Sequence, residues 1–144
     1  MNELYEEVDI AAHKIKCILK ILLVCYSPST DVEIDNYAMA NLASRVNDDI
    51  SKLFKIITTF PEKHDYDLPD YKTWLIEEVD LSLEESCHIL EILEDCYSST
   101  KGMPFSKNIL TELMTDMDEI IDRTVSSTND YCKKNQTTIN EGKL

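Results

Sequence analysis

The most constraining stretch of this chain is the apolar run Cys17–Tyr26, CILKILLVCY, in which Lys20 is the only charged residue. Apolar residues also recur every three or four positions from Leu4 onward, and this spacing predicts one helix from about Asn2 to Tyr26. In the second half of this helix, a second apolar side is added by Ile21, Val24 and Cys25. A helix that is apolar around most of its circumference is surrounded, either by its own chain or by a second copy of it.

A second long helix is predicted after the break at Pro28. It begins between Thr30 and Asp35, because Thr30 with Glu33 fits a capping box and Asp35 is a further candidate for the N-cap. Pro61 is expected to end this helix, since proline lacks the backbone N–H that a helix needs. The first two helices then form an antiparallel hairpin over residues 1–60.

Three further helices are predicted, over residues 71–79, 83–97 and 106–127. Asp70 is the expected cap of the first, and Trp74, the only tryptophan, is expected to plug the core between the two helical pairs. Ser82 and Glu85 fit a capping box at the start of the next helix. From Cys132 onward the chain shows no apolar pattern and is predicted to be disordered.

These elements predict an all-α fold. Only 2 glycines and 4 prolines occur in 144 residues, whereas a β-sandwich or barrel draws on both for its many turns. The expected architecture is a helical bundle of four main helices in two antiparallel hairpins, with a short connecting helix. We expect one domain over 1–131, made of a hairpin at 1–60, a connection with the short helix at 61–80, a hairpin at 81–131, and a disordered tail at 132–144.

The charge of the chain is strongly negative and uneven. The net charge is −14, and residues 61–99 contribute −10 of it, with 12 acidic and 2 basic side chains. Such a segment repels DNA, RNA and anionic lipid and attracts a basic surface. We therefore expect no direct binding to nucleic acid and no binding to membranes.

Cysteine and histidine are the candidate ligands for a metal site. The five cysteines contain no Cys-x-x-Cys pair, and the acidic N-terminus does not resemble a signal peptide, so reduced thiols in the cytoplasm are expected. His13 and Cys17 are one helical turn apart, while Cys87 and His88 are adjacent and Glu91 follows one turn later. Because zinc sites use tight Cys/His pairs in sets of four, no metal and no cofactor are expected.

Four acidic residues occur as two pairs, each with two residues between its members. Glu91-x-x-Glu94 is followed by Glu119-x-x-Asp122, and this pattern resembles that of the all-α nucleotide pyrophosphohydrolases. The resemblance implies that Glu91, Glu94, Glu119 and Asp122 hold Mg²⁺ ions, which bind a nucleoside triphosphate and activate water. At about 100° per residue, however, Glu91 and Glu119 turn away from the space between their helices. A Mg²⁺-dependent hydrolase is therefore the alternative hypothesis for function.

The acidic surface is the main candidate for function. If the last two long helices are antiparallel neighbours, their outer faces merge into one field of carboxylates on a rigid frame. Such rows can imitate the phosphates of a nucleic acid, and the composition resembles that of small phage-encoded inhibitors of host defence. The resemblance implies an inhibitor that docks on a basic protein surface, for example that of a nucleic-acid-binding protein. The expected partner-binding residues are Glu77, Glu78, Glu84, Glu85, Glu91, Glu94, Asp95, Glu112, Asp116 and Glu119.

Two further classes of protein stay open. One is an acidic scaffold or adaptor that binds some other partner. The other is a homodimeric structural adaptor, in which a second copy covers the second apolar side of the first helix in a C2 arrangement. The alternative for the homodimer is that the two C-terminal helices of the same chain cover that side.

Overall fold

The computed structural model describes residues 2–25, 35–68, 70–98 and 105–142, with side chains as far as residue 135. The fold is all-α: 92% helical with no strand in the described part of the chain. In chain order, the helices are α1 (Asn2–Cys25), α2 (Asn36–Lys63), α3 (Tyr71–Trp74), η1 (Leu75–Asp80), α4 (Leu81–Ser98) and α5 (Lys107–Gly142). Since α3, η1 and α4 follow one another without a break, they form one long helix, called here the Tyr71–Ser98 helix.

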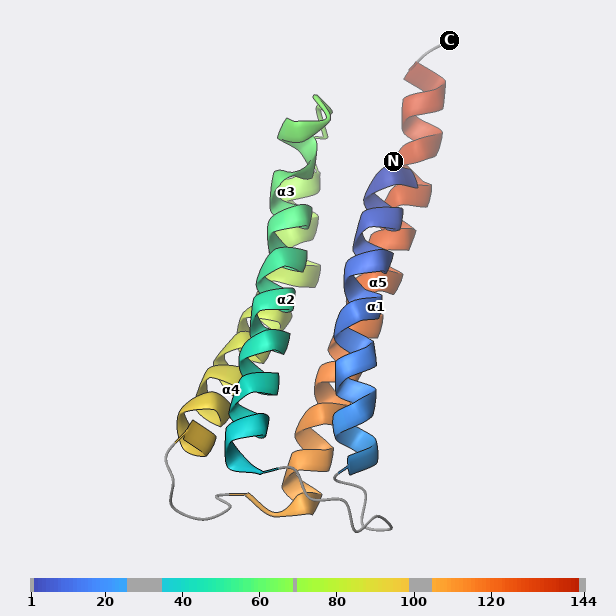
Figure 1. Ribbon diagram of the computed structural model, residues 1–144. Helices are drawn as coiled ribbons and strands as arrows, with labels where there is room; N and C mark the ends of the chain where they lie inside the picture. The colour runs from blue at the N-terminus through green and yellow to red at the C-terminus, as the bar shows by residue number, and fades with distance from the viewer. Residues whose placement is uncertain (1, 26–34, 69, 99–104, 143–144) are drawn as a thin grey trace.

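Successive long helices run in opposite directions, as Figure 1 shows. The two predicted antiparallel hairpins are thereby confirmed. Within the bundle, α1 packs most closely on α5, the last helix, and α2 packs most closely on α4. The edge between α4 and α5 has the fewest contacts of the four edges. The bundle is therefore tight on three sides and loose on the fourth.

The core is one contiguous cluster to which every helix contributes. Fully burying a large aliphatic or aromatic side chain stabilises a protein by about 1.5–3 kcal/mol, so long buried stripes hold the helices together. The stripe of α1 consists of Leu4, Val8, Ala12, Ile15, Leu19 and Leu22, and that of α2 includes Met39, Val46, Ile50, Leu53, Ile57 and Phe60.

Helix α2 begins where one of the two predicted caps lies, but it passes the proline that was expected to end it. The Asp35 carboxylate accepts a hydrogen bond from the Ala38 backbone N–H at 2.7 Å. The alternative cap, Thr30 with Glu33, lies outside the described residues. Pro61 lies inside α2, which continues to Lys63. The prediction at Pro61 is wrong because the carbonyl of Ile57, which loses its usual donor there, accepts from the Tyr71 hydroxyl instead.

The predicted break at Ser82 is also wrong. Ser82 lies inside the Tyr71–Ser98 helix, and its carbonyl accepts from the Ser86 hydroxyl at 3.1 Å. The inward residues of the first half are spaced four apart, at positions 71, 75, 79 and 83, which is longer than an α-helical turn. The π-helical turns of η1, with i→i+5 bonds, take up this longer period and keep all four residues inward.

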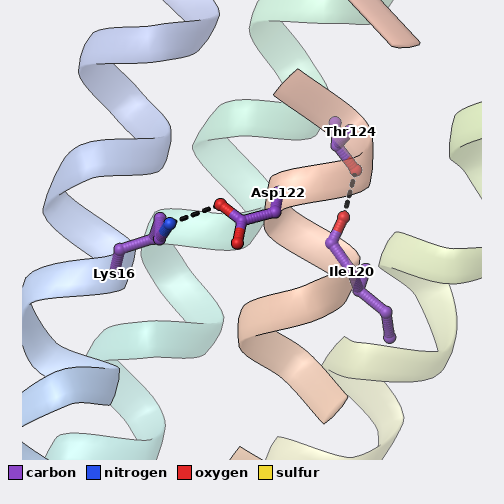
Figure 2. A network of polar contacts seen from close by, with 4 residues as sticks. All are labelled: Lys16, Ile120, Asp122 and Thr124. Atoms are coloured by element: carbon purple, nitrogen blue, oxygen red, sulfur yellow. Dashed lines mark hydrogen bonds and ion pairs between the residues drawn. The ribbon is translucent and has the colours of Figure 1, made fainter. Parts of the chain in front are cut away.

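Helix α5 begins near Ser106, as expected, but continues well beyond its predicted end at residues 126–127. Its buried stripe extends through Thr124, Thr128, Tyr131 and Cys132. The hydroxyl of Thr124 donates to the carbonyl of Ile120 at 2.9 Å (Figure 2), and that of Thr128 donates to the carbonyl of Thr124 at 2.6 Å. These bonds let polar side chains occupy core positions. The helix thus continues into the segment where disorder was expected, since Cys132 is buried and α5 runs on to Gly142.

Candidate functional site

A groove opens along the loosely packed side of the bundle, between the N-terminal half of the Tyr71–Ser98 helix and the C-terminal half of α5. Its volume is about 740 Å³. The side chains that line it include Asp70, Trp74, Glu77, Glu78, Arg123, Ser127, Asp130, Tyr131 and Lys134.

Stacked aromatic rings form one wall of the groove. Trp74 stacks on Tyr131, with ring centroids 4.7 Å apart, and Tyr71 contacts the edge of Tyr131 at 5.4 Å. The indole Nε1–H of Trp74 donates to the Ser127 hydroxyl at 2.9 Å. Because Trp74 is only half-buried, part of this fixed aromatic surface is open to a ligand. Trp74 thus lies half-buried between the Tyr71–Ser98 helix and α5, where it lines a groove that sequence reasoning missed, whereas it was expected to plug the core between the two hairpins.

The Tyr131 hydroxyl has an unmet hydrogen-bonding requirement. Tyr131 is only 6% exposed, and its hydroxyl oxygen has no hydrogen-bond partner in the described part of the chain. Burial raises the pKa of Tyr131 to about 12, and the negative charge of Asp70 acts in the same direction. A buried hydroxyl without a partner is rare in folded proteins. The hydroxyl lies beside the aromatic wall, where neighbouring atoms of the chain cover its oxygen.

The groove carries a net negative charge. Four carboxylates line it, from Asp70, Glu77, Glu78 and Asp130, against the two basic side chains Arg123 and Lys134. Of the predicted partner-binding residues, Glu77 and Glu78 belong to the groove, and both are exposed. A cationic group that entered here would meet carboxylates and aromatic ring faces together.

The other predicted partner-binding acids lie along the two helices beyond the groove. Glu84, Glu85, Glu91 and Asp95 are exposed on α4, while Glu94 is half-buried. On α5, the exposed residues of this set are Glu112, Asp116 and Glu119. The outer face of α4 also exposes Leu81 and Ile92, so it is a mixed acidic and apolar surface.

The quartet expected of a nucleotide hydrolase is not assembled. Asp122 pairs with Lys16 of α1, as Figure 2 shows, so it faces away from α4. The hydrogen bond to Asp122 is the main reason that the pKa of Lys16 is raised. Within residues 2–25, 35–68, 70–98 and 105–142, no three His, Cys, Asp or Glu side chains are grouped so that they could hold a metal ion. The hydrolase hypothesis therefore has no metal site in this part of the chain.

Among the described residues, the His/Cys pairs form no larger cluster either. The His13 Nε2 lies 3.7 Å from the Cys17 Sγ, beside a second hollow of about 580 Å³ between α1 and α5. Cys87 is half-buried and His88 is exposed. Burial is the main reason that the pKa of the Cys87 thiol is raised, which keeps it protonated and weakens it as a metal ligand.

The fold and the groove together define a class: an antiparallel four-helix bundle with an acidic groove, walled by aromatic rings, on its open side. Comparisons with models of protein families, with curated proteins and with solved structures each found no match. Among the residues that the structure describes, no helix combines the length and the apolar character needed to cross a bilayer.

Proposed function

We propose that this protein is an acidic protein-binding module, and that it binds a basic segment of a partner protein in the groove between the Tyr71–Ser98 helix and α5. The observation that carries the proposal is the meeting of acidic side chains with the Trp74–Tyr131 stack in one groove. Carboxylates bind guanidinium groups through paired, charge-assisted hydrogen bonds. Aromatic faces attract the same cation from the other side.

Arginine fits this groove better than lysine. Its planar guanidinium can lie against the exposed part of Trp74 while its N–H groups reach Glu77 or Glu78. Lysine has a compact ammonium group that cannot satisfy these contacts in one plane.

The acids beyond the groove extend the same interaction over a larger area. Glu84, Glu91 and Asp95 on α4, with Glu112, Asp116 and Glu119 on α5, extend from one end of the groove along the bundle and add negative potential that steers a basic partner toward it. A partner with a large basic surface is typically one that binds nucleic acid. The protein would then act as an inhibitor by occupying the site of the phosphates. We expect this action in the cytoplasm, since none of the five cysteines is in a disulfide.

The test uses the fluorescence of Trp74 to report binding in the groove, because Trp74 is the only tryptophan of the chain. An oligo-arginine peptide and an oligo-lysine peptide of equal length are titrated against the protein while the tryptophan fluorescence is recorded. We expect a saturable change for arginine, at least several-fold tighter than for lysine, and weaker binding as salt rises. The absence of a saturable change would refute binding in the groove.

A matched pair of variants separates the groove from net charge. Glu77→Gln/Glu78→Gln removes two charges inside the groove, and Glu84→Gln/Glu91→Gln removes two from the exposed face of α4. We expect the first variant to lose about tenfold in affinity or more, which corresponds to about 1.4 kcal/mol, and the second to lose much less. Equal losses would mean that only the total charge matters. A pull-down from nuclease-treated lysate, eluted with a salt gradient, then identifies the natural partner.

A further inference from the structure

The outward side of α1 is an apolar surface that the described part of the chain leaves uncovered. Ile10, Ile21 and Val24 are 62%, 57% and 57% exposed, and Cys17 is exposed between them. In chain order, Ile10, Cys17, Ile21 and Val24 are seven, four and three residues apart. This spacing places all four on one face of the helix, opposite the buried stripe that packs on α2 and α5. This face, called here the outer α1 face, includes part of the second apolar side expected from the sequence.

The charges beside the outer α1 face are arranged for a second copy. Glu6 and Asp9 are exposed in the first half of α1, and Lys20 is exposed in the second half. Asp9 and Lys20 lie on the same flank, since both line the hollow between α1 and α5. When two identical helices face each other in antiparallel orientation, each flank meets its own counterpart in reverse order. The acidic end of one copy then meets the basic part of the other, whereas a parallel pair sets like charges together.

We propose that two copies of this chain associate through their outer α1 faces in an antiparallel, two-fold symmetric pair. A register that sets Ile10 opposite Ile21 of the second copy places Lys20 opposite position 11. Asp9 is then about 3 Å away along the helix axis, which a lysine side chain spans easily. The same register brings the two Cys17 residues close to the symmetry axis. The groove described above involves no residue of α1, so the pair carries two open grooves.

The first test is the oligomeric state of the full chain, measured by sedimentation over a range of protein concentrations. We expect a dimer for the unaltered chain and a monomer for Ile21→Asp at the same concentrations. The matched control is Ile92→Asp, because Ile92 of α4 is 56% exposed and receives the same new charge. A monomeric unaltered chain overturns the proposal, and so does a dimer that persists in Ile21→Asp. Far-ultraviolet circular dichroism checks that each variant keeps its helices.

Charge reversal tests the antiparallel orientation independently. Asp9→Lys and Lys20→Asp should each weaken the dimer at least several-fold, because each sets two like charges together at both ends of the interface. The double variant Asp9→Lys/Lys20→Asp should restore the original affinity, since the exchanged charges meet each other again. A double variant as weak as the single ones would rule out the proposed pairing.

Cysteine chemistry gives a readout that does not depend on affinity. In the proposed register the two Cys17 residues are offset by three positions, about 4.5 Å along the axis, across an interhelical distance of about 8–10 Å. A short bismaleimide should therefore join two copies through Cys17. We expect this covalent dimer to disappear in Cys17→Ser, which leaves the other four cysteines in place. A covalent dimer that is unchanged in Cys17→Ser contradicts the pairing.

Discussion

Three residues from two helices explain why a proline is tolerated inside α2. Pro61 removes the backbone donor that would bond to the Ile57 carbonyl, and the Tyr71 hydroxyl replaces it. The bond ties α2 to the start of the Tyr71–Ser98 helix, which leads into the groove. One tyrosine thus compensates for the proline and positions the neighbouring helix.

This arrangement predicts a measurable coupling between Tyr71 and Pro61. Tyr71→Phe leaves a buried carbonyl without a partner and should lower the free energy of unfolding by about 1–3 kcal/mol. In the Pro61→Ala background a backbone N–H is available again, so Tyr71→Phe should cost much less there. Urea denaturation of the four proteins forms the double-mutant cycle. An equal cost in both backgrounds would show that the hydroxyl is not needed at Ile57.

Tyr131 predicts a dependence of stability on alkaline pH. Its pKa is raised to about 12, whereas an unfolded tyrosine ionises near about 10. Between these values the folded state holds a proton that the unfolded state has lost, so stability is complete below pH 10 and decreases as pH rises toward 12. Burial also raises the pKa of Tyr71, so phenolate absorbance should show two late-titrating tyrosines in the unaltered chain and only one in Tyr131→Phe. This variant should also lose less stability above pH 10. If stability depends on pH in the same way in Tyr131→Phe and in the unaltered chain, Tyr131 is not the group responsible.

At the scale of elements, the sequence predicts helices well and their ends poorly. Apolar spacing predicts all the long helices, and the Asp35 cap is correct because a side chain that caps a helix needs only local geometry. Pro61 and Ser82 fail because a residue distant in sequence or a π-helical turn overrides the local signal. Of the residues that line the groove, the sequence predicts Glu77 and Glu78 as partner-binding residues. Tyr131 is missed because the threonines that lead to it look like a polar segment.

The π-helical segment η1 leads to a prediction about the effect of removing one of its residues. An i→i+5 turn contains one residue more than an i→i+4 turn, so deleting Glu78, an exposed residue of η1, should convert the segment to α-helix. The inward residues keep their phase in the shortened helix, and we expect helicity and unfolding free energy to be retained. The groove wall shifts, however, and binding of the arginine peptide should weaken. Circular dichroism and Trp74 fluorescence measure the two effects, and a collapse of the fold would contradict this view of η1.

At the scale of the whole molecule, the net charge of −14 opposes the compact state. Lys16–Asp122 and Lys63–Glu7 are ion pairs of α1 and involve none of the carboxylates of the Tyr71–Ser98 helix. Sodium chloride should therefore stabilise the fold, by about 1 kcal/mol or a few degrees in Tm between low and moderate ionic strength, as repulsion is screened. Thermal unfolding at several salt concentrations measures this, and Glu84→Gln/Glu91→Gln should respond less. A salt-independent Tm would show that the carboxylates are too far apart to repel one another.

The pairing of the first helix with the last has a consequence for how the chain is made. In Figure 1, α1 lies along α5, although about a hundred residues separate them in the sequence. During synthesis, α2 and α4 are complete before α5 leaves the ribosome, so that pair can form first. The buried stripe of α1 can pack on α2 early, but the part of the stripe that faces α5 stays exposed until α5 has emerged. The final steps of translation therefore decide when this part of the apolar surface of the N-terminal helix is withdrawn from water.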